Sequence, residues 1–428
     1  MKNKFYFFAA ILSLFALMSC ASTKPVAQPQ TVILEEPQTQ QIEPDVIAVG
    51  VISALNGETR GNFIRGIHLS AYAVATQKSQ NAVIDLMNST ELNAVVIDVK
   101  EIDGAVCVPG VKTAIAYGTS RNVIPNLQNY LARLKEEGVY TIARLVVFRD
   151  GMIGKKIPAL TVKDPDGNPW VDRKNMMWLD PYNKQAWDYI LEIAEAAADM
   201  GFDEIQFDYI RFPSDGNLKL CRYSNPNHTH ATASKALVDF LKEANKRLHA
   251  KGVKISIDVF GLTTTATDDM GIGQKLVEMA EWVDYVSPMT YPSHYYNDTY
   301  NIPVPNKAPY TTVYKSMEGA TRRIPPEKMR PWLQDFSMFG VKYGPEQVRA
   351  QMQACYDNGV GDWILWNASC KYTKDALLMD GEEHNYKKNE IAEVKQIIFK
   401  EVGKNIKIIE PKVEVSTTTS TDKAESEK

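Results

Sequence analysis

The sequence predicts a (β/α)8 barrel of the TIM type with enlarged loops. When the polar ends are set aside, roughly 350 of the 428 residues remain, which suits one large barrel or two mid-sized domains. Eight short segments are candidate strands, and most of them are runs of Val, Ile, Phe and Ala, as the buried strands of a parallel sheet require. Helical segments with an apolar stripe separate them, so a strand is repeatedly followed by a helix.

The predicted elements follow one another through the middle of the chain. The strands cover residues 64–70, 93–100, 140–148, 202–208, 254–260, 283–290, 330–336 and 362–367. The clearest helices cover residues 123–137, 183–200, 233–250 and 346–356. Gly138, Gly201, Gly252 and Gly359 follow these helices, and glycine is a natural C-cap. A doubly wound open sheet is the less favoured alternative, because no glycine-rich phosphate loop follows the first strand.

The two ends of the chain differ in composition from the middle. Lys2 and Lys4 precede an apolar run at 5–18, which is too short to span a bilayer and ends in Leu-Met-Ser-Cys. This ending resembles a bacterial lipobox, which implies cleavage before Cys20 and lipidation of its thiol. We therefore expect a lipoprotein signal peptide (1–19), a flexible tether (20–60), the barrel domain (61–408) and a disordered tail (409–428). The protein would be exported and anchored to a membrane of the bacterial cell envelope.

Composition excludes some classes of function. The formal net charge is −4 and no long basic run occurs, so a nucleic-acid partner is not expected. The cysteines show no CxxC spacing; Cys355 and Cys370 could pair or remain free thiols. Cys221, His228 and His230 share a polar loop, but no fourth ligand lies at a recognisable spacing. We expect neither a metal nor a cofactor.

Polar residues fall on one face of five predicted strands, opposite an apolar face. These residues are His68, Asp98, Lys100, Arg144, Gln206, Asp208, Ser256 and Asp258. In a parallel barrel such side chains converge at the carboxyl ends of the strands. Burying them without solvent would cost too much free energy, so the alternation predicts a solvated pocket at this rim.

Two of these carboxylates point to a reaction. Asp208 ends the fourth predicted strand, and Arg211, three residues further on, is expected to hold it ionised as a nucleophile requires. A plain Asp208–Arg211 salt bridge is the alternative interpretation. Asp258 ends the fifth predicted strand at the same level. Glycoside cleavage requires such a pair, with one carboxylate ionised and the other protonated.

Four separated segments resemble a bacterial family. They are NAVVIDVKEIDG, GFDEIQFDYIRFPSDG, VSPMTYPSHY and RPWLQDF, and the resemblance covers about residues 63–372. The family is usually described as a "putative glycosyl hydrolase domain" of TIM-barrel type, so the resemblance implies both the fold and glycoside hydrolysis. The second segment is also similar to the strand-four nucleophile region of the alpha-amylase superfamily. Gln206 stands where that superfamily has an arginine, and Asp258 stands at strand five, where it has its acid/base glutamate.

Further candidates surround the carboxylate pair. Asp98, Glu101 and Asp335 are alternative proton donors. Lys100 could hold Asp98 ionised, meet an acidic sugar or form a plain ion pair. For the aromatic candidates, which could stack on a sugar ring, core packing is the alternative. The candidate substrate-binding residues are His68, Lys100, Arg144, Gln206, Tyr209, Arg211, Tyr291, Trp332, Gln334 and Trp366.

The sequence thus predicts a glycosidase that acts on a poly- or oligosaccharide with Asp208 and Asp258. Two alternatives remain open. The first is a non-catalytic glycan-binding lipoprotein of the envelope, which would use the same aromatic and acidic residues. The second is a metal-dependent cell-wall hydrolase or deacetylase, whose activity would be lost on chelation.

Overall fold

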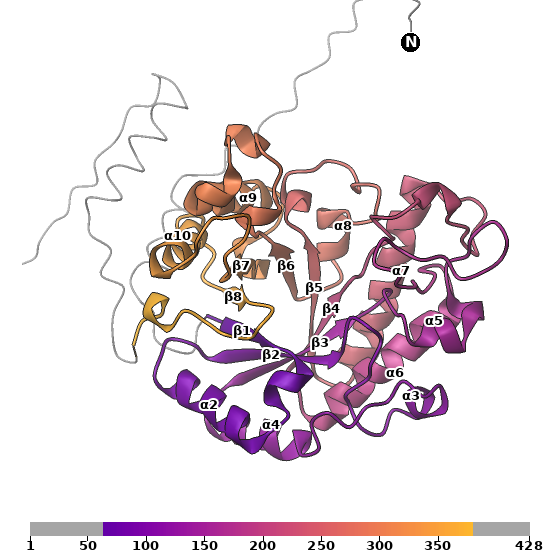
Figure 1. The fold of residues 1–428 in the computed structure, drawn as a ribbon, viewed down its shortest axis with the longest axis horizontal. Coiled ribbons are helices and arrows are strands. Elements are labelled where there is room, and N and C mark those ends of the chain that lie inside the picture. Colours follow the sequence, from indigo (N-terminus) through magenta and orange to yellow (C-terminus); the bar gives the residue numbers. More distant parts are fainter. Residues whose placement is uncertain (1–62, 380–428) are drawn as a thin grey trace, which may run out of the picture. The chain divides into compact units, whose positions relative to one another are not determined.

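The computed structural model describes residues 63–379, in which eight parallel strands close into a barrel in sequence order (Figure 1). The strands are β1 (Arg65–Leu69), β2 (Ala94–Lys100), β3 (Tyr140–Val146), β4 (Glu204–Asp208), β5 (Lys254–Phe260), β6 (Tyr285–Met289), β7 (Trp332–Gln334) and β8 (Trp363–Trp366). The pairing of β1 with β8 closes the sheet. The predicted TIM-type fold is therefore confirmed.

Helices on the connections surround the barrel (Figure 1). They are α2 (Gln77–Asn88), α3 (Lys112–Ala116), α4 (Leu127–Glu136), α5 (Ile153–Lys156), α6 (Lys184–Met200), α7 (His230–His249), α8 (Leu276–Ala280), α9 (Pro309–Thr321) and α10 (Pro345–Tyr356). Local signals set their limits. Asn183 caps α6 by accepting a hydrogen bond from the Gln185 N–H, and Gly201 ends that helix in the left-handed conformation.

All eight predicted strands are present, and β5 has the predicted limits. The largest difference is β7, which has three residues instead of the seven predicted at 330–336. Its pairing with β6 consists of Met289 opposite Trp332 alone. Pro331 precedes the strand and has no N–H to donate to a ladder, which explains the late start.

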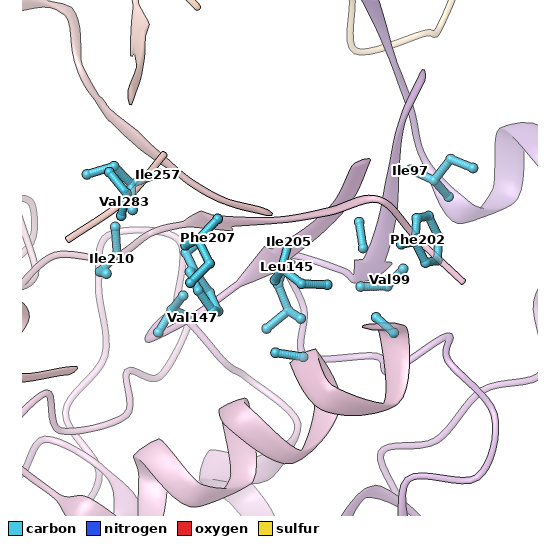
Figure 2. Close-up of a cluster of buried hydrophobic side chains, with 14 of the residues drawn as sticks. Ile97, Val99, Leu145, Val147, Phe202, Ile205, Phe207, Ile210, Ile257 and Val283 are labelled. Carbon is cyan, nitrogen blue, oxygen red and sulfur yellow. The ribbon is translucent and has the colours of Figure 1, made fainter. Parts of the chain in front are cut away.

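Side chains along each strand point alternately outward and inward, and the apolar ones form two separate layers. The outward layer packs beneath the helices, and Figure 2 shows Leu145, Ile205 and Phe207 on the side of the sheet that faces a helix. A smaller cluster lies inside the barrel and includes Val96, Ile142 and Ile364. The inward face that carries this cluster also carries the polar residues, so the pleat brings them to one end of the barrel.

Several predictions concern residues outside the described part of the chain. The signal peptide, Cys20, the tether, the tail and the limits of the barrel domain at 61 and 408 all lie there. Between residues 63 and 379 no helix is long and apolar enough to cross a bilayer. Cys107, Cys221, Cys355 and Cys370 are free thiols, so the possible Cys355–Cys370 disulfide is not formed.

Candidate active site

One pocket lies at the carboxyl ends of the strands, with a volume of about 540 Å³. Five polar residues from five consecutive strands line it, as the alternation predicts: His68, Asp98, Arg144, Asp208 and Asp258. Further lining residues come from β5, β6, β7 and β8 themselves and from the loops that follow β1, β2, β4, β5, β6 and β8. The topology therefore gathers these five polar side chains, although they are up to 190 residues apart in the sequence.

Arg144 is the centre of this group. Its Nη1 lies 2.6 Å from Asp98 Oδ1, its Nη2 contacts Asp208 Oδ2, and its Nε lies 3.6 Å from Asp258 Oδ2. Burial disfavours the charged guanidinium, but the three carboxylates outweigh burial and raise the pKa of Arg144. Arg144 is therefore a fixed cation that all three acids share.

His68 and Asp98 form one side of the group. His68 Nε2 lies 2.9 Å from Asp98 Oδ2, and the Trp366 ring lies 4.0 Å from the imidazole, centroid to centroid. Burial alone would raise the pKa of Asp98, but Arg144 and His68 together lower it. Burial also opposes a charged His68, yet Asp98 raises the pKa of the imidazole. Asp98 is therefore stabilised as an anion by Arg144 and by its hydrogen bond with His68.

Asp208 and Asp258 share Arg144 but differ in their other partners. Asp208 accepts a hydrogen bond of 2.5 Å from the Tyr209 N–H, in addition to its contact with Arg144. Asp258 accepts a bond of 2.7 Å from Trp332 Nε1 at Oδ1, whereas its Oδ2 has no hydrogen-bond partner among the described residues. Burial, followed by the negative charge of Asp208, raises the pKa of Asp258 well above its usual range. Burial and the neighbouring charge thus favour a proton on Asp258, and its free Oδ2 is the atom that can carry it.

Glu101 is a further acid that lines the pocket. It follows β2, and its Oε1 accepts a hydrogen bond of 3.0 Å from the Ala71 N–H. Burial, reinforced by the charge of Asp98, raises the pKa of Glu101 to about 7. Glu101 can therefore hold or release a proton near neutral pH.

Lys100 lies outside the pocket, although it was expected to share a face with Asp98. The β2–β3 register shifts between these residues, so Asp98 pairs with Arg144 and Lys100 pairs with Leu145, whose side chain belongs to the outward layer. Lys100 Nζ instead lies 2.9 Å from Asp150 Oδ2. This bulge reverses the direction of one side chain, which corrects the prediction from simple alternation.

Arg211 is not the ion partner of Asp208. Within the described chain Asp208 forms its ion pair with Arg144 from the neighbouring strand, and no ion pair joins it to Arg211. Arg211 does line the pocket. Both the expected role of Arg211 beside Asp208 and the alternative Asp208–Arg211 salt bridge are therefore corrected.

Three other predicted residues are buried away from the pocket lining. Gln206 lies below Asp208 in the barrel and donates a bond of 3.2 Å from Nε2 to Ser287 Oγ. The Gln334 amide accepts a bond from the Ser293 N–H and donates to the Phe336 carbonyl. Asp335 accepts bonds from the backbone and hydroxyl of Thr373. These contacts are structural, because they join strands and loops to one another.

The four predicted aromatic residues line the pocket: Tyr209, Tyr291, Trp332 and Trp366. Trp366 stacks on the Arg144 guanidinium at 5.2 Å, and Trp332 holds Asp258 through its indole N–H. Sequence reasoning missed Phe260 and His294, which also line the pocket. Phe260 is two residues beyond Asp258, so the same alternation could have found it.

No group of three or more His, Cys, Asp or Glu side chains in residues 63–379 could hold a metal ion. In the loop that carries Cys221, the His228 ring packs at a tilt against Tyr223, with the ring centroids 4.3 Å apart. His230 pairs with Asp269. These imidazoles therefore have other partners.

Residues 66–372 match the family described as "Putative glycosyl hydrolase domain". The chain belongs to this family. The match covers every strand from β2 to β8 and most of β1, and therefore the whole pocket. Family membership supports a glycosidase, in agreement with the resemblance of the four sequence segments. No curated protein matches the chain.

Solved structures similar to this glycosyl hydrolase domain include the PgaB (BpsB) glycoside hydrolase domain from Bordetella bronchiseptica. It is 15% identical, with 74% of this chain and 99% of that one covered and a TM-score of 0.55, which shows a shared barrel fold. A hypothetical protein from Ruminiclostridium thermocellum is 36% identical over 45% of this chain and 97% of its own, with a TM-score of 0.41. The alpha-galactosidase TtGalA from Thermus thermophilus is 13% identical, with 75% and 62% covered and a TM-score of 0.46.

Proposed function

We propose that this barrel hydrolyses a glycosidic bond in a poly- or oligosaccharide, with Asp208 and Asp258 as the reacting carboxylates. The observation that carries the proposal is that these two carboxylates both contact Arg144 but differ in burial and in their other hydrogen-bond partners. Asp208 has two donors, which match an ionised carboxylate, whereas Asp258 is 1% exposed and has a free Oδ2. A charged carboxylate beside a protonated one is the pair that glycoside cleavage requires.

The roles follow from these environments. Asp258 Oδ2 would donate its proton to the glycosidic oxygen as the bond to the anomeric carbon breaks. Asp208 would attack that carbon or stabilise the positive charge that develops on the sugar ring. Water then attacks the same carbon and breaks any bond that Asp208 has formed to it, so that its oxygen becomes the hydroxyl group of the product and its proton returns to Asp258. Arg144 would keep the two carboxylates in position throughout, because it contacts both.

Aromatic rings around the carboxylates support a sugar as the substrate. Tyr291 and Trp366 line the pocket with ring centroids 6.5 Å apart, and Trp332 packs edge-on against Trp366. Such rings offer apolar area to the C–H face of a sugar, while nearby polar groups can bond to its hydroxyls.

Substitution of each carboxylate tests the proposal. We expect Asp208→Asn to abolish turnover of every glycoside. The melting temperature should change little, because Arg144 retains its ion pairs with Asp98 and Asp258. Asp258→Asn should slow hydrolysis of oligosaccharides about 10²–10⁴-fold. The same substitution should slow the hydrolysis of aryl glycosides with acidic leaving groups much less, since these leaving groups need no proton donor. Reducing-end release from a glycan panel and nitrophenol release measure the two effects.

Other results would contradict this mechanism. Full activity of Asp208→Asn would remove Asp208 from the reaction. Binding of glycans without any release of reducing ends would favour the glycan-binding alternative. Loss of activity on treatment with a chelator would favour a metal-dependent hydrolase.

Glu101 is the second candidate for the proton donor. The observation that favours it is its pKa of about 7, caused mainly by burial, in a residue that lines the pocket. A donor with this pKa would be half protonated at neutral pH. The pH dependence of activity distinguishes it from Asp258.

A further inference from the structure

Arg211 lines the pocket that contains Asp208 and Asp258. It is 8% exposed and lies three residues beyond the end of β4. Its guanidinium carbon lies 4.8 Å from the Trp178 ring centroid, 4.9 Å from that of Tyr209 and 4.8 Å from that of Phe260. Three aromatic rings thus hold the guanidinium group in place.

Its hydrogen bonds occupy only one end of the group. Nη1 donates to the Phe212 carbonyl at 3.1 Å and to Ser214 Oγ at 3.0 Å. Nε and Nη2 donate to no atom in the described part of the chain. These two nitrogens form the edge of a guanidinium that binds a carboxylate with two parallel hydrogen bonds.

Arg211 also differs in charge pairing from the other buried arginines. Four arginines of residues 63–379 are buried. Arg144 contacts three carboxylates, Arg149 pairs with Asp172, and Arg330 pairs with Glu204 and Asp362. Arg211 has no ion partner among the described residues, although Asp208 and Asp215 influence it from a greater distance. A buried cation without a counter-ion is costly, which favours a negative charge supplied by a ligand.

We propose that Arg211 binds the carboxylate of an acidic sugar, so that the substrate class is a glycan containing uronic acid or a similar carboxylated residue. This inference rests on the proposed glycosidase function. The pocket already holds the carboxyl groups of Asp98, Glu101, Asp208 and Asp258. A doubly charged phosphate would meet more repulsion there than a singly charged carboxylate, and the planar free edge of Arg211 matches a carboxylate.

Matched pairs of 4-nitrophenyl glycosides test the inference: glucuronide against glucoside and galacturonide against galactoside, each as both anomers. We expect the wild-type kcat/KM to favour the acidic member of at least one pair. Arg211→Lys keeps the charge but loses the paired donors, and Arg211→Met loses both. The acidic-to-neutral ratio of kcat/KM should fall in Arg211→Met by about 10- to 100-fold, mainly through KM, and by less in Arg211→Lys.

Arg149→Lys is the matched control. Arg149 also stacks on Tyr209, at 5.7 Å, but it is paired with Asp172 and does not line the pocket. Its substitution should leave the acidic-to-neutral ratio as in the wild type. An equal loss on acidic and neutral glycosides in Arg211→Met, or a wild-type preference for neutral ones, would overturn the inference.

A binding measurement separates this inference from the proposed function. Asp208→Asn is titrated with glucuronate, galacturonate, N-acetylmuramate and glucose, and tryptophan fluorescence is recorded, since Trp178 contacts Arg211. Binding of an acidic sugar that Arg211→Met abolishes in this background supports the inference even if no glycoside is cleaved. Cleavage of neutral glycosides alone, with no acidic sugar bound, would leave the hydrolase function intact and refute the role of Arg211.

Discussion

At the scale of single residues, Arg144 organises the chemistry of the pocket. It contacts Asp98, Asp208 and Asp258, which come from three different strands. One fixed cation cannot neutralise three carboxylates, so the remaining negative charge favours a proton on the most enclosed acid. Asp258 is that acid, because burial and the charge of Asp208 both raise its pKa.

The dependence of activity on pH identifies the proton donor. A donor must be protonated, so kcat/KM is maintained below its pKa and lost as pH rises through that value. With Asp258 as the donor, we expect the alkaline fall of kcat/KM to persist in Glu101→Gln and to be absent in Asp258→Asn. A fall near pH 7 that disappears in Glu101→Gln would instead make Glu101 the donor, because its pKa is about 7.

At the scale of elements, the end of α6 determines how the chain enters β4. Gly201 has a φ of 107°, and its N–H donates to the Ala197 carbonyl. This left-handed residue ends the helix at Met200, four residues before the start of the strand that carries Asp208. A Cβ at this position would meet no atom within 4 Å. Only the backbone conformation therefore requires glycine here.

This explanation predicts different effects of two substitutions. Gly201→Ala should lower the free energy of unfolding by about 1–2 kcal/mol, because a Cβ disfavours the left-handed conformation. Gly201→Asn should cost less, since asparagine adopts this conformation more readily. Urea denaturation measures both, and an equal cost would contradict the conformational origin.

At the scale of the whole molecule, the candidate catalytic residues lie at one end of the barrel and a buried ion pair that stabilises the fold lies at the other. Opposite the pocket, Arg330 forms two bonds to Glu204, at 2.9 and 2.8 Å, and both side chains are fully buried. Tyr140 and Ser256 also donate to Glu204. Glu204 is the first residue of β4 and Asp208 is the last. The same strand therefore carries a residue of the buried ion pair at one end of the barrel and a residue of the pocket at the other.

Breaking this ion pair should affect folding rather than catalysis. Arg330→Met leaves the Glu204 carboxylate buried without its cation and should lower the free energy of unfolding by about 3–5 kcal/mol. As a control, Arg247→Met breaks the partly exposed pair with Glu195 and should cost only about 0–1 kcal/mol. Denaturant titration gives both values, and the pH profile of the folded Arg330→Met enzyme should match the wild type. A changed profile would show that the two ends are coupled.

The sequence by itself determined the fold and the location of the pocket, because both depend on periodic local patterns. Runs of apolar residues marked most of the eight strands, and alternation along five strands placed His68, Asp98, Arg144, Asp208 and Asp258 at one rim. The four short segments that resemble the glycosyl hydrolase family identified the same region. Each of these signals depends only on residues that are close together in the sequence, so it can be recognised without knowing which distant residues are in contact.

Pairings between strands were decided by the three-dimensional arrangement. The bulge after Asp98 turned Lys100 outward, and the neighbouring strand supplied Arg144 as the partner of Asp208 in place of the nearby Arg211. Register shifts and ion pairs depend on the closure of the whole barrel, in which residues distant in sequence compete for the same charge. Spacing along one chain carries no information about that competition.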